Sequence, residues 1–386
     1  MSRSKHTIAA NGHVGRPYAD HGAMAFPIFQ SSNFKYEDAA PYVATLNGGP
    51  ETKKFKYSRY TNPTEAEALR ILCELEGADG GVLVGSGMAA VSLVYSTFLR
   101  PGDHVVISEN SYYRSYSVLK RSFERIGVSV SVLMAGADLT DLLTERTTLV
   151  HVETPSNYLL RVFDIARIAD QCRAHGALLS IDSTLATPIN QNPLAHGADL
   201  VVHSASKYLG GHNDIVAGVI VGRQELVDRL AQEKGYSGAS VDPFASYLLL
   251  RGLKTLAVRM AHVNASTLRI AQELRELDGI EWVCHPGLPE HPDHELAGRY
   301  LGGGAGILYA SLAPGRGSND QTVVDFLDGL EVCVIASSFG GTESLARPAN
   351  MEEFPDHPRL IRFAIGLESA QDIVDDVKQS LKRLHA

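Results

Sequence analysis

Short apolar runs alternate with helical patterns through the middle of this chain, and few folds are compatible with that alternation. The runs that predict strands span residues 104–108, 128–133, 148–153, 178–182, 200–203 and 216–221. Strands at this spacing predict an α/β fold with a mostly parallel sheet, covered by helices on both faces. Ligands of such folds bind beyond the carboxyl ends of the strands. We therefore expect functional residues where these runs end.

The pattern changes near residue 255, where the regular alternation stops. The later elements that the sequence predicts are a helix, two strands and a final helix, at residues 253–277, 306–312, 360–366 and 370–384. Such an arrangement is typical of an α+β unit. We predict a larger domain over residues 57–255 and a smaller C-terminal α+β domain over residues 256–386.

Residues 1–56 have little regular periodicity and contain four prolines, Pro17, Pro27, Pro41 and Pro50. This composition predicts an arm or a flap rather than a domain. Residues 26–34 are unusually apolar for an exposed arm. Because such a segment is best buried on another subunit, we expect an oligomer.

Composition argues against several classes of partner. The chain has 386 residues and a formal net charge of −9, with no block of lysine or arginine. Nucleic acids and anionic membranes bind basic surfaces, so we expect a small-molecule substrate instead. No apolar run approaches the length of a membrane span, and the N-terminus lacks the apolar segment of a signal peptide. These features predict a cytoplasmic enzyme.

Cysteine and histidine spacing gives little support for a metal site. The four cysteines are scattered in apolar surroundings, which predicts reduced core residues. His285, His291 and His294 share one loop-like segment and could bind a divalent metal. We favour the alternative that this segment is a structural connector, and we expect no metal.

Lys207 is the first candidate for a catalytic group, because it closely follows the buried run at residues 200–203. Desolvation lowers the pKa of an ammonium group toward the range in which the free amine attacks a carbonyl carbon. Ser204 and Ser206 lie beside it, where their hydroxyls could hold a phosphate. A lysine and a phosphate in one site suggest pyridoxal 5′-phosphate (PLP). The alternative is a surface lysine that follows two turn serines.

Other candidates lie at the ends of predicted strands. Asp182 closes the run at 178–182 and is either a turn former or the partner of a pyridinium nitrogen. Tyr112 follows the run at 104–108 and could stack on a cofactor ring. Gly87 lies in a strand–turn–helix segment, where backbone amides at the helix start attract anions.

Two arginines are candidate anion-binding residues. Arg59, with Tyr57 beside it, could bind a phosphate or could belong to a polar turn. Arg362 lies inside the apolar run at 360–366, where an unpaired charge is costly. A bound carboxylate would satisfy it.

Several motifs occur in order along the chain. They are Tyr57-Ser58-Arg59, Asn62-Pro63-Thr64, Ser86-Gly87-Met88, Glu153-Thr154-Pro155-Ser156-Asn157, Ser204-Ala205-Ser206-Lys207-Tyr208, Arg251-Gly252-Leu253-Lys254-Thr255-Leu256 and Gly340-Gly341-Thr342-Glu343-Ser344-Leu345. Together they resemble the PLP-dependent enzymes of cysteine and methionine metabolism. That family includes cystathionine γ-synthase, cystathionine γ-lyase, methionine γ-lyase and the O-acylhomoserine sulfhydrylases. The resemblance covers nearly the whole chain and implies the type I, aspartate-aminotransferase-like fold, with the cofactor in the domain over residues 57–255.

The resemblance implies a role for each candidate. Lys207 would bind PLP as a Schiff base and transfer protons, and Tyr112 would stack on the ring and assist proton transfer. The other cofactor-binding residues would be Tyr57, Arg59, Ser86, Gly87, Met88, Asp182, Ser204 and Ser206. The substrate would be held by Asn157, Ser338 and Arg362. Tyr57 and Arg59 would come from a neighbouring subunit of a homotetramer built from tight dimers.

The chain departs from the family pattern where substrate side chains would lie. Tyr112 is followed by Tyr113 and Arg114 instead of two glycines, and Ser337 stands where cystathionine-handling members commonly have glutamate. The family's His-Pro-Ala-Ser-Met-Thr-His run is replaced by Arg347-Pro348-Ala349-Asn350-Met351-Glu352-Glu353. These changes predict the family's cofactor chemistry on a different substrate.

The function that the resemblance implies is γ-elimination or γ-replacement on a γ-substituted L-amino acid, in the manner of trans-sulfuration enzymes. Alternatives on the same scaffold are β-elimination, decarboxylation and O-acylhomoserine sulfhydrylation. A cofactor-bearing regulatory protein without catalysis is a further alternative. Retention of Lys207, Asp182, Tyr112 and Arg362 together argues against it.

Overall fold

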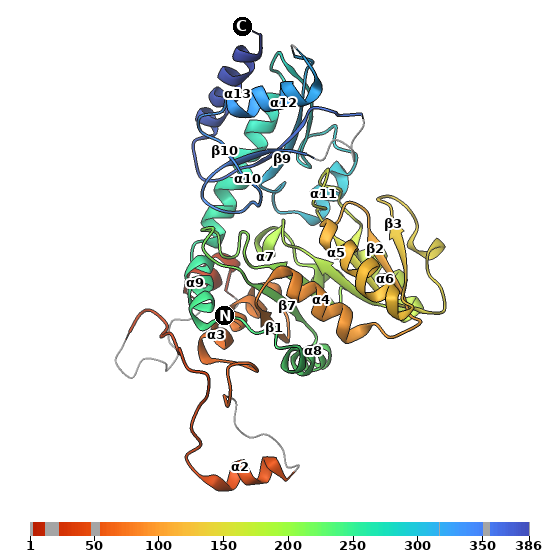
Figure 1. Cartoon of the computed structure of the whole chain (residues 1–386), viewed down its shortest axis with the longest axis vertical. Helices are drawn as coiled ribbons and strands as arrows, with labels where there is room; N and C mark the ends of the chain where they lie inside the picture. Colours follow the sequence, from red (N-terminus) through yellow and green to blue (C-terminus); the bar gives the residue numbers. More distant parts are fainter. Residues whose placement is uncertain (1–2, 12–22, 48–54, 316, 350–355, 386) are drawn as a thin grey trace.

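The computed structural model describes residues 3–11, 23–47, 55–315, 317–349 and 356–385. Figure 1 shows a larger lobe, a smaller lobe that carries the C-terminus, and an extended arm near the N-terminus. Helix α10 (Leu256–Leu274) runs from the larger lobe into the smaller one. The domain limits at residues 56 and 255 remain predictions.

The larger lobe is built on a seven-stranded sheet with the order β1-β7-β6-β5-β4-β2-β3. Its strands are β1 Gly80–Val84, β2 His104–Ser108, β3 Ser129–Leu133, β4 Thr147–Glu153, β5 Leu178–Asp182, β6 Leu200–Ser204 and β7 Gly218–Gly222. The predicted α/β fold with a mostly parallel sheet is confirmed. Strand β7 is antiparallel to both neighbours, β1 and β6. No helix lies between β6 and β7 to form a crossover, so the chain returns in the opposite direction.

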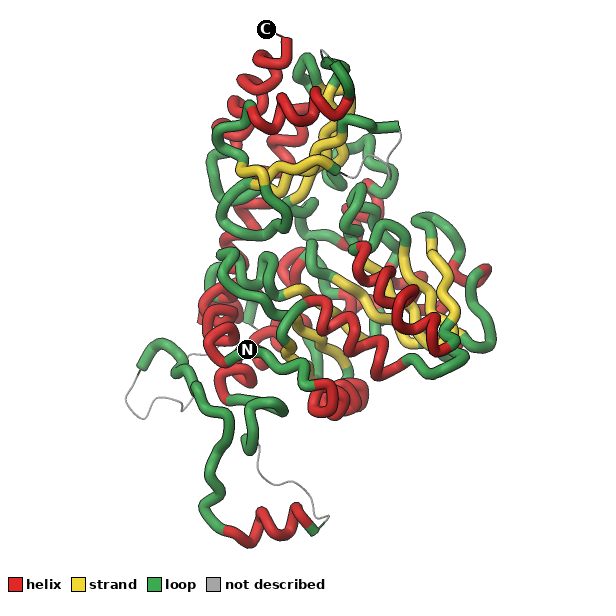
Figure 2. The backbone as a smooth tube through the Cα atoms, in the orientation of Figure 1, coloured by secondary structure: helices red, strands yellow, loops and turns green. Residues whose placement is uncertain are grey.

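Helices cover both faces of this sheet, as Figure 2 shows. The covering helices are α3 Pro63–Glu76, α4 Gly87–Phe98, α5 Tyr113–Val118, α6 Ile165–His175, α7 Thr187–Asn190, α8 Gln224–Ser237 and α9 Pro243–Leu253. Helices α4 and α8 pack on one face, and α3 and α6 pack on the other. Shorter turns of π or 3-10 helix lie at Leu119–Phe123, Glu124–Ile126, Leu139–Asp141 and Pro193–His196. The apolar runs of the sequence are therefore buried on both sides.

The smaller lobe contains a five-stranded sheet with the order β10-β11-β12-β9-β8. Its strands are β8 Ile280–Cys284, β9 Ile307–Leu312, β10 Val334–Ile335, β11 Leu345–Pro348 and β12 Leu360–Ala364. One face packs on α10, α12 (Asn319–Asp328) and α13 (Ala370–His385). The alternate residues of the same strands pack toward the larger lobe. Helix α11 (His294–Tyr300) lies between the two lobes in Figure 1.

The N-terminal arm carries two short helices, α1 (Lys5–Asn11) and α2 (Ala39–Leu46). Helix α1 packs on α3 and α10, whereas α2 extends away from the body (Figure 1). Apolar side chains on the arm are exposed, with Met24 at 74% and Leu46 at 68%. This surface agrees with the expectation that the arm meets another subunit.

A buried ion pair joins two helices of the larger lobe. Lys234 on α8 donates a hydrogen bond of 2.5 Å to Glu65 on α3, and both side chains are almost wholly buried. Burial raises the pKa of Glu65 to about 7, although the Lys234 ammonium opposes the shift. The pair is therefore needed to keep the Glu65 carboxylate charged in this position.

Replacing one partner of this pair should destabilise the larger lobe. Lys234→Met leaves Glu65 buried without its cation, and we expect the free energy of unfolding to fall by about 3–5 kcal/mol. Urea unfolding followed by circular dichroism measures this change. The double variant Glu65→Leu/Lys234→Met, which removes both charges, should recover most of the loss. Equal stability of the Lys234→Met variant and the unmodified chain would contradict the prediction.

Candidate active site

Polar side chains meet at the carboxyl ends of three adjacent parallel strands. Glu153 ends β4, Asp182 ends β5, and Lys207 follows β6 by three residues. Glu153 and Asp182 are direct neighbours in the β4–β5 register. The structure thus places the predicted residues at the edge of the sheet where ligands of this fold bind.

Lys207 is connected to the smaller lobe through Ser338. The Lys207 Nζ donates a hydrogen bond of 2.6 Å to Ser338 Oγ, and Arg362 donates one to the Ser338 carbonyl oxygen. Ser338 has a positive φ of 85°, which turns the loop so that both contacts form. Lys207 and Arg362, two candidates from separate parts of the sequence, therefore both contact Ser338.

Arg362 is a buried cation without a carboxylate partner in the described part of the chain. Its side chain is 4% exposed, and its Nε has no hydrogen-bond acceptor. Burial lowers its pKa. An uncompensated buried guanidinium is costly, and a ligand carboxylate would relieve that cost through a bidentate contact.

The amine of Lys207 is half-buried, and burial, together with the nearby Arg362 charge, lowers its pKa to about 8. Its Nζ also lies 5.1 Å from the centroid of the Phe339 ring. A lysine with this pKa is a free amine in a substantial fraction of molecules near neutral pH. It can act as a nucleophile and as a base.

Asp182 is linked to Ser204 by Thr184. Thr184 donates hydrogen bonds to Asp182 Oδ1 from its backbone N–H at 3.0 Å and from its hydroxyl at 2.5 Å. The same hydroxyl accepts a bond of 2.8 Å from the Ser204 backbone N–H. Sequence reasoning missed Thr184, although an aspartate followed two residues later by threonine is a known turn pattern.

The start of α4 forms a close-packed cradle with the loop after β6. A side chain at Gly87 would place its Cβ 2.7 Å from the Cβ of Ser204, so only glycine fits here. Ser86 caps α4 by accepting a hydrogen bond of 3.0 Å from Ala89, and Met88 follows in the first turn. Ser206 exchanges hydrogen bonds with Ala217 across the same loop. The geometry brings helix-start amides and serine hydroxyls together, as a phosphate site requires.

Tyr112 lies at the mouth of the site, 39% exposed, at the start of α5. Its backbone N–H donates a hydrogen bond to Glu153, which is buried. Burial, and next the Asp182 charge, raise the pKa of Glu153 well above its ordinary value. Glu153 fixes the backbone of Tyr112 through this hydrogen bond. Sequence reasoning did not find this contact.

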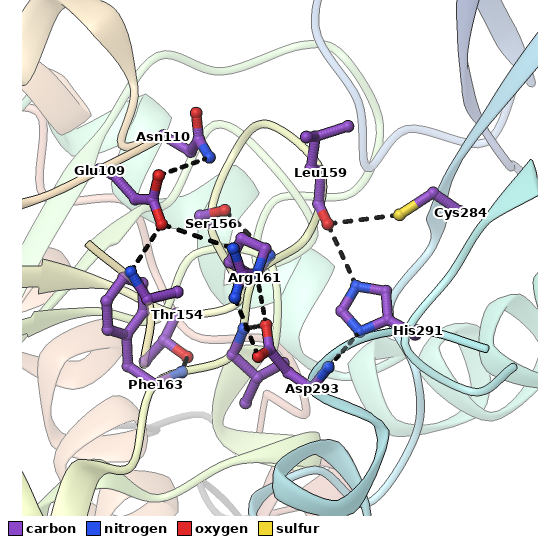
Figure 3. A network of polar contacts seen from close by, with 12 residues as sticks. Glu109, Asn110, Thr154, Ser156, Leu159, Arg161, Phe163, Cys284, His291 and Asp293 are labelled. Carbon is purple, nitrogen blue, oxygen red and sulfur yellow. Dashed lines mark hydrogen bonds and ion pairs between the residues drawn. The ribbon is translucent and has the colours of Figure 1, made fainter. Parts of the chain in front are cut away.

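Asn157 lies on a loop that is held from both lobes. Its carbonyl oxygen accepts a hydrogen bond of 2.6 Å from Tyr309 of β9. Figure 3 shows the neighbouring contacts: the Leu159 carbonyl oxygen accepts from His291 and from Cys284. Leu159 has a positive φ of 56°, a conformation that these contacts stabilise.

Arg161 secures the end of the same loop. It forms a two-point contact with Asp293 at 2.7 and 3.2 Å, and it lies 3.5 Å from Glu109 (Figure 3). Glu109 directly follows β2, and Asp293 precedes α11. Arg161 thus joins the loop of Asn157 to both lobes. Sequence reasoning missed Arg161 and Asp293, because they are 132 positions apart.

Tyr57 and Arg59 are not brought to the Lys207 cluster in the single chain. Both are exposed, and the Arg59 guanidinium lies over the rings of Tyr57 and Tyr60 at 5.1 and 5.0 Å. Their position beside the arm leaves them available to another chain. A shared site remains a prediction.

The three loop histidines have structural partners. His285 contacts the Ala305 carbonyl oxygen, and His294 contacts that of Pro286. Among the described residues, no group of three or more His, Cys, Asp or Glu side chains is arranged to hold a metal ion. The same residues include no helix that combines the length and apolarity needed to cross a bilayer.

Solved structures with this fold identify the class. The structure superposes on the crystal structure of cystathionine gamma synthase from Xanthomonas oryzae pv. oryzae in complex with aminoacrylate and cysteine with a TM-score of 0.91. Sequence identity is 32%, over 100% of this chain and 99% of that one. The fold and the lysine-centred cluster define a PLP-dependent enzyme of fold type I.

Sequence comparison gives the family. Residues 6–382 match the family model described as Cys/Met metabolism PLP-dependent enzyme, and the chain belongs to that family. It is 37% identical to L-methionine gamma-lyase from Pseudomonas deceptionensis, over 95% of this chain and 94% of that protein. It is 35% identical to cystathionine beta-lyase from Lactococcus lactis subsp. cremoris, over 94% of this chain and 95% of that protein. The predicted family, enzyme class and cofactor are confirmed.

The residues present suit PLP. The close approach of Gly87 to Ser204 leaves the backbone amides at the start of α4 free of side-chain obstruction for a phosphate. The orphaned Nε of Arg362 fits the carboxylate of an amino-acid substrate beside the cofactor. Within the described residues, both hydrogen bonds that reach the Asp182 carboxylate go to Oδ1. This arrangement fits a pyridine nitrogen as the partner of Oδ2.

The lowered pKa of Lys207 predicts how capture of PLP depends on pH. Because only the free amine attacks the aldehyde, the capture rate of cofactor-free protein should rise with pH and level off above about pH 8. Arg362→Met removes a neighbouring positive charge, so the rise should move to higher pH. Stopped-flow absorbance in the visible range measures both rates.

Lys207→Ala is the control, since it cannot form the Schiff base and should give no such absorbance. A capture rate that is constant between about pH 7 and 9.5 would show that the amine is not titrating as its surroundings imply.

Proposed function

We propose that this enzyme removes or replaces a γ-substituent on an L-amino acid. The observation that supports this most directly is the contact chain from Lys207 through Ser338 to Arg362. An amino acid whose carboxylate binds Arg362 would have its α- and β-carbons close to the Lys207 amine. One mobile amine could then take a proton from the α-carbon, release it, and take a second proton from the β-carbon.

The chemistry divides between cofactor and protein. PLP supplies the electron sink that stabilises negative charge at the α-carbon when it is bound. Lys207 would remove the α-proton, give it up to the bound cofactor and, as a free amine again, remove a β-proton, and the γ-substituent would leave with the electrons of its bond. Asp182 would keep a positive charge on the pyridine nitrogen, and Tyr112 would hold the face of the ring. The phosphate would be held by Ser86, Gly87, Met88, Ser204 and Ser206.

The substrate carboxylate binds Arg362, with Ser338 and Asn157 beside it. Ser338 also places the Lys207 amine, because its hydroxyl accepts the amine's hydrogen bond. Substrate binding and proton transfer therefore depend on the same loop. That arrangement keeps the amine close to the carbon from which the first proton is taken.

We favour elimination over replacement. The loop over residues 335–341 has Ser337 where cystathionine-handling relatives have glutamate, and it offers no evident site for a second amino acid. The relative from Pseudomonas deceptionensis is named as a gamma-lyase, which agrees with this preference. A second candidate is β-elimination, which needs no additional residues. The relative from Lactococcus lactis is named as a beta-lyase.

A product screen separates these reactions. Purified enzyme with PLP is supplied with L-amino acids that carry different γ- or β-substituents, with and without an added thiol. Ammonia and a four-carbon 2-oxo acid without thiol identify γ-elimination, and a thioether that forms only with thiol identifies γ-replacement. Pyruvate from β-substituted compounds alone would replace our proposal with β-elimination. Lys207→Ala should lower turnover by at least about a thousandfold in every case.

We further propose a homotetramer of tight dimers in the cytoplasm, with Tyr57 and Arg59 completing the phosphate site of the partner subunit. The exposed arm and the exposure of both side chains support this arrangement. Arg59 would then neutralise the cofactor phosphate from across the interface.

Complementation tests the shared site. Arg59→Ala and Lys207→Ala subunits should each be inactive alone. Co-refolded in equal amounts, they should recover about a quarter of normal activity, because half of the dimers are mixed and each mixed dimer has one complete site. Mixing two preparations of Lys207→Ala is the control. No recovery in stable mixed dimers would place Arg59 in its own subunit's site or outside the site.

A further inference from the structure

Two arginines lie side by side on the face of the smaller sheet that points to the active site. Arg347 of β11 is directly opposite Arg362 of β12, and Arg362 is directly opposite Tyr309 of β9. Residues directly opposite each other in antiparallel strands point to the same face. Ala346, the neighbour of Arg347, packs into the core with the covering helices, so Arg347 is on the other face.

This face meets the loop of the larger lobe that carries Asn157. Tyr309 donates to the Asn157 carbonyl oxygen, and Cys284, opposite Tyr309 on β8, donates to that of Leu159. Arg362 contacts the Ser338 carbonyl oxygen on the same side. Cys284, Tyr309, Arg362 and Arg347 therefore form a row across the four strands. Arg347 lies one strand beyond Arg362, about 5 Å from the proposed α-carboxylate site.

The charge of Arg347 is not neutralised within the described residues. It is half-buried, and its hydrogen bond of 2.8 Å goes to the carbonyl oxygen of its own neighbour, Pro348. Like charges directly opposite each other in a sheet are unfavourable. Adjacent guanidinium groups are instead well suited to a ligand with two separated anionic groups.

We propose that Arg347 is a specificity-determining residue that binds an anionic group on the γ-substituent of the substrate. The proposal rests on the γ-chemistry proposed above. It assigns the substrate to the class of amino acids whose leaving group carries a carboxylate or a phosphate. Arg362 binds the α-carboxylate and Arg347 binds the distal anion. A neutral γ-substituent of the same length leaves Arg347 without a partner and is discriminated against.

The binding test needs no turnover. L-2-Aminoadipate, which has a distal carboxylate, and L-norleucine, which has none, are titrated into the PLP-loaded enzyme and followed by the cofactor's visible absorbance. We expect aminoadipate to bind about tenfold more tightly. Arg347→Met should remove this preference without weakening norleucine binding, and Arg347→Lys should keep part of it.

Arg223→Met is the matched control. Arg223 is an exposed arginine that pairs with Asp199 at the opposite edge of the larger sheet, so its loss removes the same charge far from the site. The Arg223→Met enzyme should keep the preference for aminoadipate over norleucine. If Arg347→Met does not fold, the test uses Arg347→Gln and measures how the preference for aminoadipate over norleucine depends on salt concentration.

The results distinguish the possible roles of Arg347. Equal weakening of both ligands would assign Arg347 to the α-carboxylate and overturn the proposal. No effect on either ligand would assign Arg347 to a structural role and would also overturn the proposal.

A kinetic comparison separates this inference from the proposed function. O-Succinyl-L-homoserine and O-acetyl-L-homoserine differ in the charge of the ester, and we expect a ratio of kcat/KM of about ten in favour of the succinyl ester, lost in Arg347→Met. Turnover of both esters at equal efficiency would overturn the inference but keep the γ-chemistry. Turnover of neither ester, and of no other γ-substituted compound in the product screen, with aminoadipate still preferred, would overturn the γ-chemistry but keep the anion site.

Discussion

The site depends on the burial of the Lys207 amine, which removes it from water. Burial lowers its pKa to about 8, and Ser338 fixes the position of the amine. The smaller lobe contributes to this burial, because Ser338 lies against the amine. Arg362 and the Phe339 ring, both from that lobe, complete the surroundings of the amine. The reactivity of a residue in one lobe is therefore set by the docking of the other.

The docking itself is specific. The row of Arg347, Arg362, Tyr309 and Cys284 presents one side of the smaller sheet to the loop over residues 154–161. Hydrogen bonds from Tyr309, Cys284 and His291 end on backbone carbonyl groups of that loop. Because backbone groups are the acceptors, the loop's conformation matters more than its side chains. Asn157 is positioned as part of this interface.

Strand ends were the part of the site that sequence could predict. Lys207 and Asp182 follow or close buried runs, and Arg362 interrupts one, so their unusual settings are visible in the sequence alone. Thr184, Glu153 and Asp293 were missed because their roles arise from contacts between distant segments or from backbone geometry. The fold class was predicted correctly from the alternation of runs. The antiparallel direction of β7 was not, since it depends on the connection after β6 rather than on the strand's own residues.

The exposed arm affects how this protein reaches its working form. A newly folded single chain carries Met24 and Leu46 into water, along with the rings of Tyr57 and Tyr60. Folding of the lobes is a first-order process, whereas in the oligomer proposed above covering the arm would require an encounter with a second chain. At low protein concentration the lobes would fold before a second chain is met, and the apolar surface of the arm would stay exposed to water. In that oligomer, the yield of active protein would depend on the competition between correct pairing and aggregation of the exposed arms.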